Sequence, residues 1–179
     1  MLNNINIVIG ITGGIAAYKA CGVISYLKSE GANVDVIMTK NACEFISPLT
    51  IETLAKSKVI TDMFKRPDYI EVEHISLATK ADLFLIIPAT ANIIGKVACG
   101  IADDMLSTTI MATKVPVIFV PAMNTNMYEN KIVQANIKKL ESYGYKFIEP
   151  DVGKLACGVI DKGKMPKTKK IIDYVKEVI

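Results

Sequence analysis

The glycine-rich segment at residues 10–16 (GITGGIA) is the first part of the chain that could do chemistry. It follows a strand-like run and precedes a helical pattern, so its bare backbone amides and the positive end of the helix dipole favour a phosphate. It departs from the dinucleotide fingerprint G-x-G-x-x-G, and Thr39 ends the second strand-like run where a ribose-binding acid is expected. A hydroxyl there suits a monophosphate. Ordinary turn and cap chemistry at Gly13, Gly14 and Thr39 is the alternative interpretation.

Two further segments, residues 88–92 (PATAN) and 103–109 (DDMLSTT), combine small side chains with polar ones. Small residues let a flat ring approach the backbone closely. Four polar residues of these segments can hydrogen-bond such a ring or a phosphate: Thr90, Asn92, Ser107 and Thr108. Each of them alone is typical of a helix cap. Together they predict one wall of a binding site.

His74 is the only histidine of the chain. An unperturbed histidine titrates near neutral pH, so His74 is the candidate for a base, although a lone histidine is more often structural. The four cysteines lie far apart without a C-x-x-C pair, which together with the single histidine argues against a zinc site or a disulfide framework. We expect Cys21, Cys43 and Cys99 to pack within helices.

The composition indicates a compact globular chain of 179 residues, with 51% hydrophobic and 22% charged residues. The longest apolar runs, such as residues 83–87 and 115–123, are far shorter than the ~18 residues of a membrane span, and no secretory signal is readable. We therefore expect a cytoplasmic protein with no membrane partner. The net charge is only +3 and Arg66 is the sole arginine, which is unlike a nucleic-acid reader.

Strand-like and helical patterns alternate along the chain. Buried-type strands are expected at residues 5–9, 33–38, 83–87, 117–120 and 145–148, and helices at 17–30, 48–55, 91–99, 104–113, 126–142 and 168–178. Gly31 should stop the first helix and Pro48 should start the second. This order predicts one α/β domain over residues 1–179, with a doubly wound, mostly parallel sheet. Ligands of such sheets lie beyond the carboxyl ends of the strands.

Residues 121–128 (PAMNTNMY) closely resemble the P-x-M-N-x-x-M-W motif of the flavin-dependent cysteine decarboxylases. This family includes the phosphopantothenoylcysteine decarboxylases and the lantibiotic-processing decarboxylases. Segments 10–19, 38–42, 73–78, 88–92 and 104–109 are similar to their counterparts in the family. Residues 153–165 resemble the A-C-G-x-x-x-x-G-x-M substrate-covering loop of the phosphopantothenoylcysteine branch, and the lantibiotic enzymes lack its cysteine, here Cys157. The chain departs from the family pattern at Tyr128, which replaces tryptophan, and at Val159, which replaces an acidic residue.

The resemblance implies a Rossmann or flavodoxin-like fold that binds FMN and decarboxylates 4′-phosphopantothenoylcysteine to 4′-phosphopantetheine in coenzyme A biosynthesis. The substrate cysteine would lose hydride to FMN and become a thioaldehyde. Its carboxylate would then leave as CO₂, because the carbanion is delocalised onto sulfur. Protonation of the resulting enethiol, with return of hydride, would give the aminothiol and oxidised FMN.

The resemblance also implies roles for individual residues. His74 would be the base of the oxidation, Cys157 the acid that protonates the enethiol carbon, and Asn124 the group that orients the carboxylate. An amide suits that task because strong stabilisation of the carboxylate would raise the barrier to its loss. The expected FMN-binding residues are Gly13, Gly14, Ile15, Thr39, Pro88, Ala89, Thr90, Asn92, Ser107 and Thr108. The expected substrate-binding residues are Ala122, Met123, Asn124, Met127 and Lys162.

The family further implies a homotrimer, or an assembly of trimers such as a homododecamer, with FMN held between neighbouring subunits. Residues 150–165, rich in glycine, are expected to form a flexible substrate lid. Alternative functions remain a lantibiotic-type peptidyl-cysteine decarboxylase, a flavin prenyltransferase, or a non-catalytic regulatory subunit of the same fold. The sequence also leaves open a ligase domain beyond residue 179.

Overall fold

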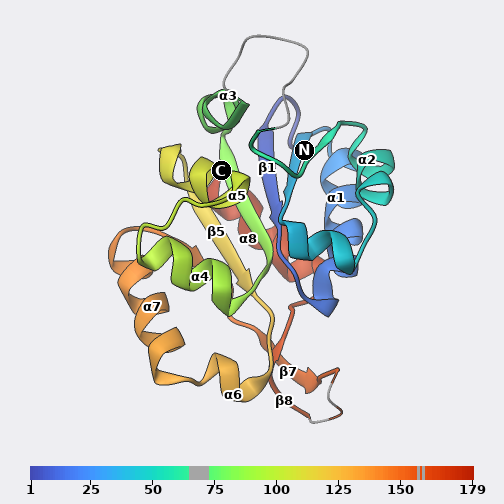
Figure 1. The fold of residues 1–179 in the computed structure, drawn as a ribbon. Coiled ribbons are helices and arrows are strands. Elements are labelled where there is room, and N and C mark those ends of the chain that lie inside the picture. The colour runs from blue at the N-terminus through green and yellow to red at the C-terminus, as the bar shows by residue number, and fades with distance from the viewer. Residues whose placement is uncertain (65–72, 157, 159) are drawn as a thin grey trace.

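The computed structural model describes residues 1–64, 73–156, 158 and 160–179, and its centre is a parallel sheet of six strands (Figure 1). The strands stand in the order β3 (Val59–Ile60), β2 (Asn33–Met38), β1 (Asn6–Ile11), β4 (Leu83–Ala89), β5 (Val117–Pro121) and β6 (Lys146–Phe147). An antiparallel hairpin of β7 (Asp151–Lys154) and β8 (Ile160–Lys164) lies apart from this sheet, beyond the carboxyl ends of its strands. The parallel α/β architecture predicted from the sequence is confirmed.

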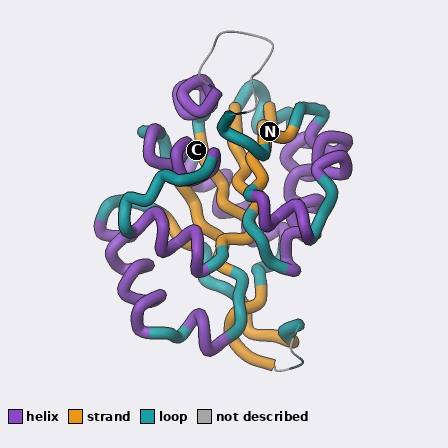
Figure 2. The backbone as a smooth tube through the Cα atoms, viewed as in Figure 1, coloured by secondary structure: helices purple, strands orange, loops and turns teal. Residues whose placement is uncertain are grey.

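Helices cover both faces of the sheet (Figure 2). One face packs on η1 (Ile15–Lys19), α1 (Ala20–Ser29), α2 (Pro48–Ala55) and α8 (Thr168–Val178). The other packs on α3 (Glu73–Lys80), α4 (Ala91–Ala98), α5 (Met105–Ala112) and α7 (Lys131–Ser142). Strand β1 shows why two cores form, because Ile7 and Ile9 belong to the first core and Val8 to the second. Such two-sided burial explains the continuous apolar runs of the sequence.

Local signals account for several helix ends. Pro48 is the first residue of α2, where its missing N–H leaves no partner unsatisfied, and Gly31 follows α1 with a φ of +90°. Asp104 and Ser107 form a reciprocal cap on α5: the Ser107 N–H donates to Asp104 Oδ1 at 2.8 Å, and the Asp104 N–H donates to Ser107 Oγ at 3.1 Å. These ends agree with the sequence predictions.

Three expectations need correction. The single helix expected over residues 126–142 is two helices, α6 (Thr125–Tyr128) and α7, because the Asn130 side chain caps α7 by accepting from the Ile132 N–H at 2.9 Å. Strand β1 continues to Ile11, two residues beyond its predicted end. Cys99 follows α4 and is exposed, so it is not a packing residue, whereas Cys21 and Cys43 are partly buried.

No helix within the described residues is both long and apolar enough to span a membrane.

Candidate functional site

The site begins where the strand order reverses between β1 and β4. Thr12, directly after β1, is 2% exposed; its Oγ1 donates to the Pro88 carbonyl at 2.6 Å and accepts from the Thr90 N–H at 3.1 Å. This one hydroxyl therefore joins the loops that follow the two neighbouring strands. A crevice at such a reversal, outside the carboxyl ends of the strands, is the usual ligand position in open α/β sheets.

A polar cavity of about 430 Å³ lies at this reversal. The predicted residues Gly13, Thr39, Thr90 and Asn92 line it, together with Thr12, Lys40, Asn41, Lys96 and Asp104, which were not among the predicted site residues. Thr39 and Thr90 are helix caps, which confirms the alternative interpretation, and their role in cofactor binding stays a prediction. The hydroxyls, amides and lysines of this cavity form a donor set suited to a phosphate.

Gly13 lies where two loops of the polar cavity are in close contact. A Cβ built at residue 13 would overlap Asn41 and come within 2.9 Å of its carbonyl carbon. Asn41 belongs to η2 (Lys40–Glu44), the turn after β2. The loops after β1 and β2 therefore touch at a point that only glycine fits.

A salt-bridged acid closes one edge of the polar cavity. Burial raises the pKa of Asp104, but the bonds from Lys96 and Ser107 lower it more, so its pKa lies below the ordinary value. Lys96 Nζ lies 2.6 Å from Asp103 and 2.8 Å from Asp104. Burial lowers the pKa of Lys96, and the two carboxylates more than reverse that effect. Asp104 and Lys96 are thus both charged at neutral pH.

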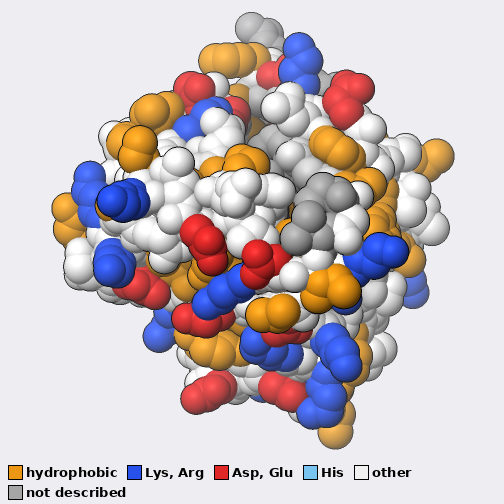
Figure 3. Space-filling model, turned by 90° about the horizontal axis from the view of Figure 1, so that it is seen from below, with side chains coloured by type: hydrophobic (Ala, Val, Ile, Leu, Met, Phe, Trp, Pro, Cys, Tyr) orange, Lys and Arg blue, Asp and Glu red, His pale blue; other side chains and the backbone are white. Residues whose placement is uncertain are grey.

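A larger cavity of about 590 Å³ adjoins the polar one and shares Gly13, Thr90, Ala91 and Met127 with it. Gly14 and Ile15 line it on one side, and Ala122, Met123 and Asn124 line it on another. The β7–β8 hairpin completes the wall with residues 154–156 and 163–165. Figure 3 looks at this end of the molecule, where hydrophobic side chains lie among lysines and acidic residues.

The β5 loop, residues 122–127, is attached to the hairpin. The Met123 N–H donates to the Gly163 carbonyl at 3.1 Å, and Thr125 Oγ1 donates to the Lys162 carbonyl at 2.7 Å. Gly163 has a φ of +137°, and a Cβ there would overlap the Met123 carbonyl oxygen. Asn124 caps α6 by accepting from the Asn126 N–H at 2.9 Å while it lines the large cavity. The predicted lid is therefore a hairpin fixed to the loop that carries Asn124.

Several predicted site residues line neither cavity. Pro88 and Ala89 are buried in β4, Ser107 is buried in the cap of α5, and Thr108 Oγ1 donates to the Ala102 carbonyl at 3.3 Å. Lys162 instead pairs with Glu149 at 3.0 Å, with its Nζ 5.5 Å from the centre of the Tyr128 ring. Their binding roles stay predictions.

Of the three predicted catalytic residues, Asn124 alone lines a cavity among the described residues. His74 is in the first turn of α3, a helix that contacts α5 through Leu77 and Ala78 on the second face of the sheet. It lines neither cavity. Cys157 lies outside the described residues, although the preceding residue, Ala156, lines the large cavity. A single chain thus brings the carboxylate-orienting candidate to the site but not the candidate base.

Sequence reasoning missed three lysines of the large cavity: Lys19, Lys154 and Lys164. Nothing in their local patterns marks them, because lysines are spread along the whole chain. Thr12 and Asn41 could have been found from the sequence, because they lie in residues 10–16 and 38–42, two segments already singled out from the sequence. Only the tertiary arrangement shows which lysines face a cavity.

Comparison with known families and proteins places these features in context. A family model described as Flavoprotein matches residues 1–179. The coenzyme A biosynthesis bifunctional protein CoaBC of Bacillus subtilis strain 168 is 51% identical over 177 residues, which cover 99% of this chain and 44% of that protein. The chain spans about half the length of this bifunctional relative.

Two further similar proteins match along nearly their whole length. The probable phosphopantothenoylcysteine decarboxylase of Streptococcus mutans is 42% identical over 173 residues, covering 96% of this chain and 97% of that protein. A solved structure of a PPC decarboxylase mutant in complex with pantothenoylaminoethenethiol superposes with a TM-score of 0.89 at 28% identity, covering 98% of each chain. The likeness thus extends over nearly the whole chain.

Proposed function

The chain belongs to the flavoprotein family, and from this premise we propose that it is an FMN-dependent decarboxylase of 4′-phosphopantothenoylcysteine, with 4′-phosphopantetheine as product, in coenzyme A biosynthesis. One observation carries the proposal: Asn124 lines a large cavity that is walled in part by the hairpin, and that cavity shares lining residues with a polar one at the strand reversal. The name of the Streptococcus relative supports the same substrate, and the name of the Bacillus relative supports the same pathway. The cytoplasm remains the predicted location.

The polar cavity fits the phosphate end of FMN. It offers Thr39, Asn41 and Lys40 as donors, and the loops at Gly13 are too close for any larger residue. Because Thr90 lines both cavities, a single elongated cofactor bound beside it would contact residues of both. When bound, FMN supplies a hydride acceptor that later returns the hydride.

Asn124 would orient the substrate carboxylate. A carboxylate accepts hydrogen bonds, so it would face the amide nitrogen, which is the donor of this side chain. An amide donor positions a carboxylate without the strong ground-state stabilisation of a guanidinium. The apolar neighbours Ala122 and Met127 would exclude water while the charge leaves as neutral CO₂.

His74 would act in the site of a neighbouring subunit, since it lines neither cavity of its own chain. Two large apolar side chains that line the large cavity are exposed in the single chain, Ile15 at 59% and Met127 at 49%, and Leu49 at the start of α2 is 69% exposed. Such a surface is typical of a protein–protein contact. We therefore propose the homotrimer, or an assembly of trimers, as the active form.

Cys157 would protonate the enethiol carbon after CO₂ has left. Its neighbour Ala156 lines the large cavity, opposite the β5 loop. Gly158 and Gly163, both with positive φ, flank this part of the hairpin. The hairpin would thus bring an acid to a site from which water is excluded.

Purified protein tests the proposal directly. We expect a flavin absorbance spectrum and, with 4′-phosphopantothenoylcysteine, a product lighter by one CO₂ in mass spectrometry. Asn124→Asp sets a negative charge against the carboxylate and should lower kcat/KM by at least roughly 100-fold, whereas Asn126→Asp, exposed on the same short helix, is the matched control. Absence of flavin after addition of FMN, or full activity of Asn124→Asp, would contradict it.

Mixed assemblies test the position of His74. His74→Asn and Asn124→Asp should each be inactive alone. Co-expression should restore about a quarter of the sites, because some interfaces then pair two intact surfaces. If His74 served its own chain, no mixture of these two variants would contain an intact site.

A further inference from the structure

Three lysines line the large cavity from two sides. Lys19 ends η1, whereas Lys154 and Lys164 end the two strands of the hairpin. The described residues of the cavity wall include no aspartate or glutamate. The described part of the wall is therefore cationic. Its positive charges come from segments that lie far apart in the sequence.

These lysines differ from their neighbours in how their charges are balanced. Lys162 lies 3.0 Å from Glu149, and Lys170 lies 2.8 Å from Asp151. Among the described carboxylates, none is within ion-pair distance of Lys19, Lys154 or Lys164. Within the described part of the chain, the cavity lysines therefore have no carboxylate counterion.

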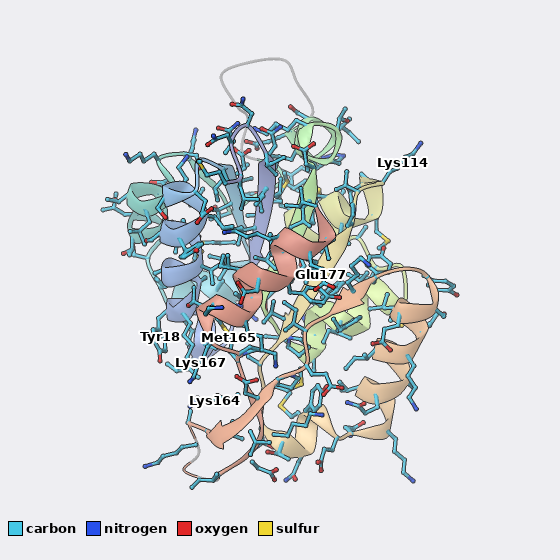
Figure 4. The ribbon with its side chains drawn as sticks, turned by 180° about the vertical axis from the view of Figure 1, so that it is seen from behind. Tyr18, Lys114, Lys164, Met165, Lys167 and Glu177 are labelled. Carbon is cyan, nitrogen blue, oxygen red and sulfur yellow. The ribbon has the colours of Figure 1, made fainter. Side chains whose placement is uncertain are left out.

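Lys19 and Lys164 also lie close enough to repel each other. Burial lowers the pKa of Lys19, and the positive charge of Lys164 lowers it further. A Cβ at Gly153 would come within 2.7 Å of Lys164 Cδ and 3.2 Å of its Nζ, so the Lys164 side chain lies across the hairpin, directly over Gly153. Figure 4 shows Lys164 on the hairpin near Tyr18, the residue before Lys19. An external anion would relieve this repulsion.

We propose that Lys19 and Lys164, with Lys154 at the rim, bind the terminal phosphate of the substrate and make the enzyme selective for phosphorylated over unphosphorylated substrates. The inference rests on the proposed function, because it assigns a binding site to the phosphate end of the substrate whose carboxylate Asn124 would orient. Lysines suit a phosphate monoester as point charges. The phosphate of FMN is the competing anion, and the polar cavity has its own donors for that group.

Kinetics with 4′-phosphopantothenoylcysteine and pantothenoylcysteine test this selectivity. Lys19→Met and Lys164→Met remove the charges and keep the aliphatic stems. We expect the ratio of kcat/KM for the two substrates to fall about tenfold for each variant and about 100-fold for the double variant. Lys→Arg at both positions should restore most of the ratio. Lys167→Met, close to Met165 but off the cavity wall, is the control of equal charge.

The outcomes separate the possible sources of the effect. An unchanged ratio, or equal losses for both substrates, would overturn the phosphate subsite. Weaker FMN binding without loss of selectivity would assign the lysines to the cofactor and also overturn it. If the wild-type protein decarboxylates neither substrate, the proposed function fails. Calorimetric binding of 4′-phosphopantetheine against pantetheine then still decides the role of the lysines, since equal affinities would overturn it.

Discussion

On the cofactor side of the site, the loops after β1 and β4 are joined by the buried Thr12 hydroxyl, and the loop after β2 touches them at Gly13. On the hairpin side, β7 and β8 are attached to the β5 loop through Gly163 and Thr125. The first region lies at the carboxyl ends of the central strands and is held by buried contacts of small residues, Thr12 and Gly13. The second carries exposed lysines on a two-stranded ribbon.

This difference indicates that one region is suited to holding the cofactor and the other to admitting the substrate. A preformed crevice with buried hydrogen bonds suits a cofactor that stays bound through many cycles. A ribbon that lies outside the main sheet can open with little disturbance of the core, because isolated two-stranded hairpins are marginally stable. Damage to the cofactor side should therefore remove flavin, whereas damage to the hairpin side should spare flavin and impair turnover.

Gly163→Ala tests the hairpin side and should have the largest effect. The added Cβ would overlap the Met123 carbonyl oxygen, and the φ of +137° disfavours any side chain. We expect flavin content to stay normal while kcat/KM falls by roughly 100-fold, as measured by absorbance and steady-state kinetics. Gly100→Ala, with a φ of +69° but open space around it, is the control for backbone strain alone.

Gly13→Ala tests the cofactor side. The new methyl group would push the turn at Asn41 away from the loop after β1, at a cost of about 1–3 kcal/mol. FMN affinity should fall by roughly 5- to 150-fold in a fluorescence titration. Gly95→Ala, in α4 with its nearest neighbour 3.8 Å away, should keep flavin and slightly raise stability. Flavin binding that survives Gly13→Ala unchanged would contradict the preformed crevice.

Matched threonine substitutions compare how firmly each side is held. Thr12→Val leaves the Pro88 carbonyl and the Thr90 N–H without their partner and should lower the free energy of unfolding by about 2 kcal/mol. Thr125→Val removes one bond, to the Lys162 carbonyl, and should cost about 1 kcal/mol. Urea unfolding measures both. Thr53→Val, on an exposed helix surface, is the control and should change the free energy of unfolding little. Equal losses of unfolding free energy at positions 12 and 125 would contradict the difference between the two sides of the site.

Asp104→Asn should have the smallest effect and a defined pH dependence. The native pKa of Asp104 is depressed, so its contribution is fully present above the unfolded value near 3.8 and is lost as the pH falls through the lower native pKa. The loss of the cap and ion pair should cost about 1 kcal/mol at pH 7. The stability difference between wild type and variant should shrink below pH 4, and a constant difference would show that Asp104 carries no depressed pKa.

The sequence predicted the architecture because its signals are local. Apolar runs on both strand faces, Pro48 and Gly31 define the elements and their order, and helices between parallel strands allow few arrangements. The break at Asn130 was missed because an asparagine inside an amphipathic pattern reads as an ordinary polar residue. The motif at residues 121–128 indicated the family and named Asn124, which lines the large cavity.

The tertiary structure alone decided which side chains meet. Lys19 and Lys164 face one cavity while Lys162, two residues away in β8, pairs with Glu149, and no local pattern separates these lysines. His74 lies on a helix that lines neither cavity, so its predicted role as a base requires the site of a neighbouring subunit. Periodicity and turn chemistry act between near neighbours in the chain, so they determine elements. Cavities form between segments more than a hundred residues apart, and only the packed fold brings those segments together.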